Sequence, residues 1–294
     1  MIADEELAQW VESVRLAPAP ETMPPLHELR APRERPRGPE VDIVEDALVG
    51  SRPRIRIRRY RHERPDRPTV VYAHGGGFVF GDLESHDRAC RRLAVLGDVD
   101  VVAVDYRLAP EHPAPAAIDD VVAVVEELAS DRPGRRLGLA GDSAGGLLAY
   151  LAAHRLVATG APPAGLLLLN PNADLTLSRE STRTKAHGWG LSTEALRWFI
   201  EQWVPAGHAS PEQYSPLARS AAGMPPTIVV TCEHDPLHDE GAELAQLVDA
   251  AGTPVRHHDL AGMVHGFITL DTVSPAARRA GDRVFAEFGR LLRS

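Results

Sequence analysis

The chain of 294 residues carries a formal net charge of −9 at pH 7, which argues against the concentrated basic face that nucleic-acid binding requires. Its two cysteines, Cys90 and Cys232, cannot form a disulfide framework, so we expect both to be reduced and structural. The N-terminal segment MIADEELAQW lacks the basic and apolar regions of a secretory signal, and no apolar run is long enough to span a bilayer. We therefore expect a cytoplasmic protein without a membrane-spanning segment.

The first third of the chain shows little regular patterning. Residues 1–40 have no strand pattern, and the charged, proline-rich stretch 31–40 is typical of a connector. In the basic run 52–64, isoleucine alternates with arginine, which is the period of a strand with one solvated face. We predict an exposed edge strand there.

From residue 69 onward, short apolar runs alternate with helical patterns. Near-continuous apolar strands separated by helices predict an α/β fold, with a mostly parallel sheet covered by helices on both faces. The predicted strands are 69–73, 100–106, 136–140, 165–170, 227–232 and 255–260, and the predicted helices are 118–130, 145–159, 239–252 and 276–292.

The stretch 171–222 interrupts this alternation and is too long to be a structureless loop in a compact domain. We predict that it contains its own helices, one of them at 191–204 with Ser192 or Thr193 as N-cap. An insertion at this point of an α/β sheet is a candidate lid.

The motif GDSAGG at 141–146 directly follows a predicted strand. A G-x-S-x-G pattern places its serine on a sharp strand-to-helix turn, where small neighbours leave the hydroxyl exposed. Because the bare pattern also arises by chance in glycine-rich chains, Ser143 needs support from the rest of the sequence.

A second glycine-rich loop, HGGGFVFGD at 74–82, follows the first predicted parallel strand. Acyl transfer builds an oxyanion, and a glycine loop together with the amide after the nucleophile can supply the N–H donors that stabilise it. His74 adjoins this loop, and we expect it to fix the loop by hydrogen bonding. The lysine of a phosphate-binding P-loop is missing from this segment.

A serine nucleophile needs a base, and the base needs an orienting carboxylate. His265 follows the last predicted strand and Asp235 follows the strand before it, so both belong at the carboxyl edge of the sheet. Of the neighbouring acids, Glu233 ends the strand, Asp239 has the position of a helix N-cap and Glu240 falls in the first helical turn.

The flanking histidines His234 and His238 have a spacing that could hold a metal, although no further ligand cluster supports one. The chain order of Ser143, Asp235 and His265 is that of the α/β-hydrolases.

Five blocks resemble the hormone-sensitive-lipase-like branch of the α/β-hydrolases, the bacterial family IV carboxylesterases. The resemblance covers about residues 69–270. The blocks are HGGGFVFGDLESHD (74–87), DYRLAPEHPAPAAIDD (105–120), GDSAGG (141–146), CEHDPLHDEG (232–241) and GMVHGF (262–267).

This resemblance implies an α/β-hydrolase core at 41–294 with a helical cap, formed by residues 1–40 and by the insertion at about 171–222. Carried over by position, Ser143 is the nucleophile, Asp235 the acid and His265 the base. The implied oxyanion hole consists of Gly76, Gly77 and the Ala144 amide, with loop support from His74 and Gly75. The candidate aromatic pocket walls are Phe78, Trp189, Trp198, Phe199 and Trp203. Leu147 stands where the family usually has asparagine.

The sequence thus predicts a serine carboxylesterase acting on short to medium acyl esters, with no metal and no organic cofactor. Two alternatives stay open: an acyltransferase, deacetylase or amidase of a biosynthetic pathway, and a catalytically inactive ligand-binding homologue. As partners we expect a small-molecule ester and no nucleic acid, with a homodimer as one open state of assembly.

Overall fold

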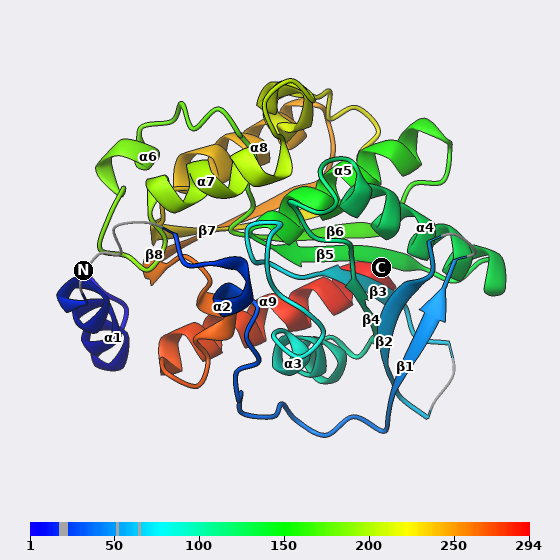
Figure 1. Ribbon diagram of the computed structural model, residues 1–294. Helices are drawn as coiled ribbons and strands as arrows, with labels where there is room; N and C mark the ends of the chain where they lie inside the picture. Colours follow the sequence, from blue (N-terminus) through cyan, green and yellow to red (C-terminus); the bar gives the residue numbers. More distant parts are fainter. Residues whose placement is uncertain (18–22, 51–52, 64–65) are drawn as a thin grey trace.

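The computed structural model describes residues 1–17, 23–50, 53–63 and 66–294, and a sheet of eight strands forms its centre (Figure 1). The strands lie in the order β1-β2-β4-β3-β5-β6-β7-β8. β2 is antiparallel to both of its neighbours, and all the later pairs are parallel. The strands are β1 (Ile43–Val49), β2 (Ile55–Arg61), β3 (Thr69–Ala73), β4 (Asp100–Asp105), β5 (Leu137–Asp142), β6 (Gly165–Leu169), β7 (Thr227–His234) and β8 (Val255–Val264).

Successive residues of the central strands point to opposite faces of the sheet and join two separate apolar cores. On β3, Val71 belongs to one core, whereas Val70 and Tyr72 belong to the other. The first core is completed by α4 (Ala116–Asp131), α5 (Ala144–Ala158) and α8 (His238–Ala250), and the second by α3 (Asp87–Gly97) and α9 (Pro275–Arg293). Figure 1 shows α3 and α9 below the sheet and α5 and α8 above it. The predicted α/β fold with helices on both faces is confirmed.

The predicted edge strand in the basic run is a strand, but it is not at the edge. β2 pairs with β1 on one side and with β4 on the other, so β1 is the edge strand. Asp46 of β1 accepts hydrogen bonds from the guanidinium groups of Arg56 and Arg58, each at 2.6 Å. The side chains of the alternating arginines therefore contact a carboxylate of the neighbouring strand β1, and the periodicity of the sequence alone could not show this. Residues 52 and 64 of the run lie outside the described residues.

The insertion at 171–222 contains α6 (Ser181–Thr184), α7 (Thr193–Trp203), η1 (Pro211–Tyr214) and η2 (Pro216–Ala218). The predicted helix is confirmed as α7, and its N-cap is Ser192, whose hydroxyl accepts the Ala195 amide at 3.1 Å. In Figure 1, α7 lies over the end of the sheet that carries β7 and β8.

The N-terminal segment reaches the same end of the molecule. It contains α1 (Glu5–Leu16) and α2 (Leu26–Leu29). Leu7 and Val11 of α1 are buried in the second core, and the Arg15 guanidinium donates to the Gly188 carbonyl at 3.2 Å. The chain end and the insertion thus touch each other beside the carboxyl edge of the sheet. None of the helices in the described ranges combines the length and the apolar character needed to cross a bilayer.

Candidate active site

Ser143 lies on the tight turn between β5 and α5, with φ 56° and ψ −123°. A positive φ is uncommon for a residue with a side chain, and here it accompanies a turn that presents the hydroxyl at the end of the sheet. A Cβ atom at Gly145 would lie 2.0 Å from the Ala73 carbonyl oxygen. Glycine is therefore required for α5 to begin this close to the end of β3, which explains the second glycine of the motif.

The side chains of Asp235 and His265 meet at Ser143. The His265 Nε2 atom lies 2.9 Å from Ser143 Oγ, and its Nδ1 atom lies 2.8 Å from Asp235 Oδ2. Asp235 directly follows β7 and is fully buried, and its second oxygen accepts the Leu237 amide at 2.8 Å. An Nδ1–H donated to the carboxylate leaves Nε2 to accept the serine proton. The arrangement has the geometry of a nucleophile, a base and an orienting acid.

The glycine loop after β3 lines the same pocket as Ser143 and His265. Gly76 and Gly77 have φ values of 123° and 58°, a region that glycine adopts at little cost. Among the hydrogen bonds of the described residues, none engages the amides of Gly76, Gly77 or Ala144. These N–H groups can therefore serve as donors to an oxyanion.

His74 stands at the start of this loop with its ring buried. Its Nδ1 atom donates to the Gly75 carbonyl at 2.7 Å, and its ring stacks on Tyr106 with centroids 4.2 Å apart. The Tyr106 hydroxyl in turn donates to the His74 carbonyl at 2.8 Å. Burial, reinforced by nearby His86, lowers the pKa of His74 to about 4, so the ring is neutral at pH 7. These contacts fit the predicted role of loop support.

A second anchor of the loop, Asp142, was missed by the sequence reasoning. This buried carboxylate directly precedes Ser143 and accepts the Gly75 amide at 3.1 Å and the Tyr72 hydroxyl at 2.7 Å. His86 Nε2 lies 3.2 Å from its other oxygen. The signal was present in the motif itself, because a carboxylate at the end of a fully apolar strand needs buried donors. Asp142 thereby ties the nucleophile turn to the glycine loop.

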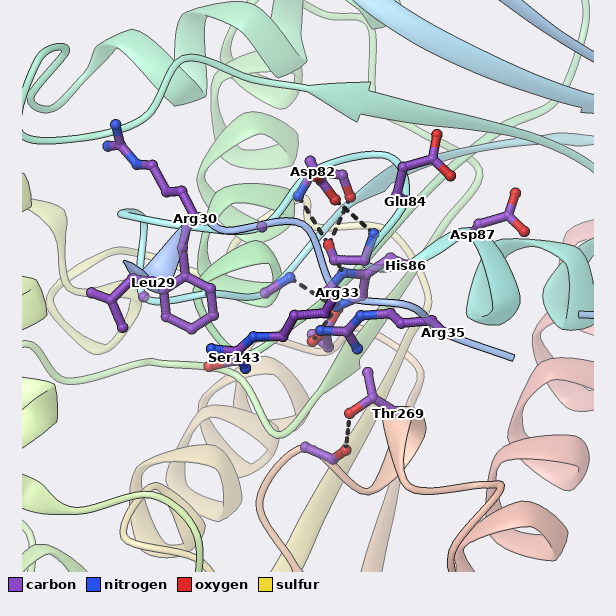
Figure 2. A pocket seen from close by; sticks show the side chains of 18 of the residues that line it. Leu29, Arg30, Arg33, Arg35, Asp82, Glu84, His86, Asp87, Ser143 and Thr269 are labelled. Atoms are coloured by element: carbon purple, nitrogen blue, oxygen red, sulfur yellow. Dashed lines mark hydrogen bonds and ion pairs between the residues drawn. The ribbon is translucent and has the colours of Figure 1, made fainter. Parts of the chain in front are cut away.

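A pocket of about 1450 Å³ opens over Ser143. Figure 2 shows Ser143 among the residues that line it, together with Leu29, Arg30, Arg33 and Arg35 of the N-terminal segment. Apolar lining residues from the insertion are Leu191, Ala195, Leu196, Phe199 and Ile200.

Of the five predicted wall residues, Phe78 and Phe199 are among the residues that line this pocket, whereas Trp189, Trp198 and Trp203 are not. Trp203 is fully buried and stacks on Phe78 with ring centroids 4.1 Å apart. Trp189 stacks on His234, and Trp198 packs edge-on against Phe199 behind the pocket lining. The tryptophan that the sequence reasoning overlooked is Trp10 of α1, which lines the pocket.

His234 and His238, which were considered as metal ligands, contact different neighbouring residues. The His234 ring stacks on Trp189 at 4.1 Å, whereas His238 contacts Asp239 at 2.8 Å and Asp259 at 3.2 Å. Within the described ranges, no group of three or more His, Cys, Asp or Glu side chains is arranged to hold a metal ion. Both cysteines are free and buried.

The predicted N-cap role of Asp239 is wrong. α8 begins one residue earlier, at His238, so Asp239 lies inside its first turn. Its carboxylate instead accepts the Ser181 amide at 2.8 Å and links the helix to the insertion. Glu240 lies in the first turn as expected, and its buried carboxyl accepts the Ala173 amide at 2.6 Å.

The parallel sheet, the serine on its strand-to-helix turn, and the acid and histidine after the last two strands define an α/β-hydrolase. The comparison with family models agrees: the model described as the alpha/beta hydrolase fold matches residues 70–269. The chain belongs to this family.

Curated relatives match across most of the chain. It is 38% identical to the esterase LipI of Mycobacterium tuberculosis, covering 87% of this chain and 84% of that one. It is 40% identical to the carboxylesterase NlhH of the same species, covering 78% and 75%, and 32% identical to an ethyl acetate hydrolase of Pseudomonas putida, covering 93% and 94%. Among solved structures, the hyperthermophilic esterase of Pyrobaculum calidifontis superposes with a TM-score of 0.86 at 31% identity, covering 100% of both chains.

Proposed function

We propose that the chain hydrolyses carboxylic esters of short to medium acyl length, with Ser143 as nucleophile, His265 as base and Asp235 as acid. It is a carboxylesterase, as its esterase relatives over most of its length indicate. The observation that carries the catalytic proposal is the continuous hydrogen-bonded line from Ser143 Oγ through His265 to the buried Asp235 carboxylate. The five motif blocks support the assignment of the enzyme to the hormone-sensitive-lipase-like branch.

In the proposed reaction, His265 Nε2 takes the proton of Ser143 as its oxygen attacks the ester carbonyl. The amides of Gly76, Gly77 and Ala144 stabilise the oxyanion of the tetrahedral intermediate. The intermediate collapses, the alcohol leaves with the proton from His265, and an acyl-enzyme remains. Water, activated by the same histidine, then releases the acid and restores the serine. No step needs a metal ion or an organic cofactor.

Residues 1–40 and about 171–222 form the proposed cap over the catalytic domain. The pocket supports this division, because Trp10 and Arg30 reach it from the N-terminal part and Leu196 and Phe199 from the insertion. The Phe199 ring lies so close to the glycine loop that a Cβ atom at Gly77 would be 2.4 Å from its Cγ atom. We infer that this ring limits the room for the acyl chain next to the oxyanion hole.

A panel of p-nitrophenyl esters from acetate to dodecanoate tests the proposal. We expect kcat/KM to be highest for the acetyl to octanoyl esters and to fall for dodecanoate, with product formed as free acid. Phe199→Ala should move the preference towards longer chains. A maximum at dodecanoate would contradict the proposed chain length, and preferential transfer of the acyl group to an added alcohol or amine would contradict hydrolysis as the main reaction.

A further inference from the structure

The segment that follows α2 lines one side of the active-site pocket and is fastened at both ends. At one end, the Arg30 guanidinium donates to the carbonyls of Val79 and Ala109, each at 2.8 Å. At the other end, the Arg37 carbonyl accepts a hydrogen bond from Arg88 at 2.6 Å. Prolines at positions 32 and 36 restrict the backbone between these anchors. We refer to residues 30–37 as the arch.

Two arginines, Arg33 and Arg35, line the pocket from the middle of the arch. Figure 2 shows both side chains extending from the chain into the pocket, with that of Arg33 directed towards Ser143. Both residues are exposed, so an incoming molecule can reach their guanidinium groups. Because the segment is fastened, it holds these two guanidinium groups in the same pocket as Ser143.

Neither arginine has an anionic partner in the described part of the chain, where no ion pair or side-chain hydrogen bond involves either one. Most of the carboxylates that line the pocket are already engaged by other arginines. The pairs are Asp46 with Arg56 and Arg58, Glu84 with Arg58, Asp87 with Arg91, and Asp105 with Arg56. Arg30 and Arg88 are likewise paired, with Glu111 and Asp271.

Three further lining carboxylates, Glu34, Asp82 and Asp142, have no arginine partner among these ion pairs, and Asp142 is held by His86 and Tyr72. The Asp82 carboxylate accepts the Ser85 amide at 2.7 Å, and Glu34 lies between the two arginines in the chain. The cationic groups that remain free to meet a substrate are thus concentrated on the arch, in a protein whose formal net charge is −9. The arch itself carries four arginines and one glutamate, so its local charge is positive and attracts anions.

We propose that Arg33 and Arg35 make the enzyme selective for esters that carry a carboxylate close to the scissile bond. The planar guanidinium group matches a carboxylate in a two-point hydrogen bond, whereas a neutral ester gains nothing from it. The apolar residues of α7 would hold the uncharged part of the same substrate. This inference rests on the proposed ester hydrolysis and specifies its substrate class.

Two anionic probes test the proposal, each compared with its neutral methyl ester. Monomethyl glutarate carries the carboxylate on the acyl side, and O-acetylglycolate carries it on the alcohol side. The measured quantity is the ratio of kcat/KM for the anionic ester to that for the neutral one. We expect the double variant Arg33→Gln/Arg35→Gln to lower this ratio by about tenfold for at least one probe. Arg37→Gln removes one positive charge from the arch, at a residue paired with Glu40, and should keep the wild-type ratio.

Ionic strength gives a second measurement on the unmodified enzyme. In the wild type, the ratio of kcat/KM for the anionic ester to that for the neutral ester should decrease as the salt concentration is raised from roughly 0.05 to 0.5 M, because salt screens exposed charges. In the double variant, the ratio should change much less. A ratio that is equal in both proteins for both probes would overturn the selectivity while leaving ester hydrolysis intact. An enzyme that hydrolyses neither the charged nor the neutral probes would overturn the proposed function and the selectivity with it.

Discussion

Replacement of Asp142 by asparagine tests how far the active site depends on the carboxylate that ties the glycine loop to the nucleophile turn. The buried carboxylate accepts hydrogen bonds from the Gly75 amide and the Tyr72 hydroxyl and lies 3.2 Å from His86 Nε2. Asparagine has nearly the same shape but carries no charge, and one of its two polar ends is a donor. An amide N–H facing the Gly75 amide would leave two donors opposed and would push the glycine loop away from the nucleophile turn.

The expected loss of free energy of unfolding can be worked out from the pKa of the Asp142 carboxyl. Burial alone would raise the pKa of Asp142, but its contacts with His86 and Tyr72 outweigh burial and hold the pKa at about 2, below the ordinary 3.8. Because one pKa unit corresponds to about 1.4 kcal/mol, the ionised carboxylate contributes about 2 kcal/mol to the free energy of unfolding at neutral pH. This contribution is present above the ordinary pKa and is lost as the pH falls towards 2.

We therefore expect Asp142→Asn to lower the free energy of unfolding by about 2 kcal/mol and kcat by about tenfold to a hundredfold. Urea unfolding at pH 7 and ester turnover measure the two effects. The matched control is Asp100→Asn, which removes a buried carboxylate paired with Arg135 at the far end of β4. The control should lose stability but keep kcat. Equal losses of kcat in both variants, or wild-type kcat in Asp142→Asn, would refute the reasoning.

Three further predictions concern other parts of the site. Asp235→Asn should lower kcat on the order of 10⁴-fold with the melting temperature preserved, whereas Asp239→Asn should change stability alone; the reverse pattern in paired kinetics and thermal melts would reject the assignment of the acid. His74 has a pKa of about 4 in the folded protein, so the unfolded chain binds a proton at a higher pH than the folded protein does. The free energy of unfolding of the wild type should therefore fall by about 3 kcal/mol as the pH drops from about 6.5 to 4. Urea unfolding of His74→Gln should not show this pH-dependent loss. Trp10→Ala should widen the pocket and raise the relative kcat/KM for octanoyl over acetyl esters, and an unchanged ratio would argue against the N-terminal part of the cap.

The parallel strands could be predicted because burial on both faces gives them continuous apolar sequences. The stretch 69–73 matches β3, and the stretch 227–232 falls within β7. β1 has no such signal, since its sequence IVEDALV places two acids in the middle of a strand whose carboxylates pair with arginines of β2. The position of β2 in the sheet depends on that unpredicted neighbour, so the sequence could not reveal it.

Within the site, the acid and the base could be predicted because each directly follows a strand, and the carboxyl ends of parallel strands lie at one edge of the sheet. The side chains of the insertion were harder to assign. Helical periodicity predicts that Phe199 and Trp203 share one face of α7, but the lining of the pocket depends on what packs against that face. Phe199 meets the glycine loop, whereas Trp203 is covered by Phe78. The role of Asp142 required knowledge of the buried donors around it.

The central claim is that Ser143 is the nucleophile, and covalent labelling tests it most directly. The enzyme is incubated with a fluorophosphonate, and its intact mass and the modified peptide are determined. The account predicts one adduct per chain, on Ser143, with loss of ester hydrolysis, and no adduct on the folded Ser143→Ala variant. Labelling of that variant at the wild-type rate, or an adduct on another residue that accompanies inactivation, would contradict it.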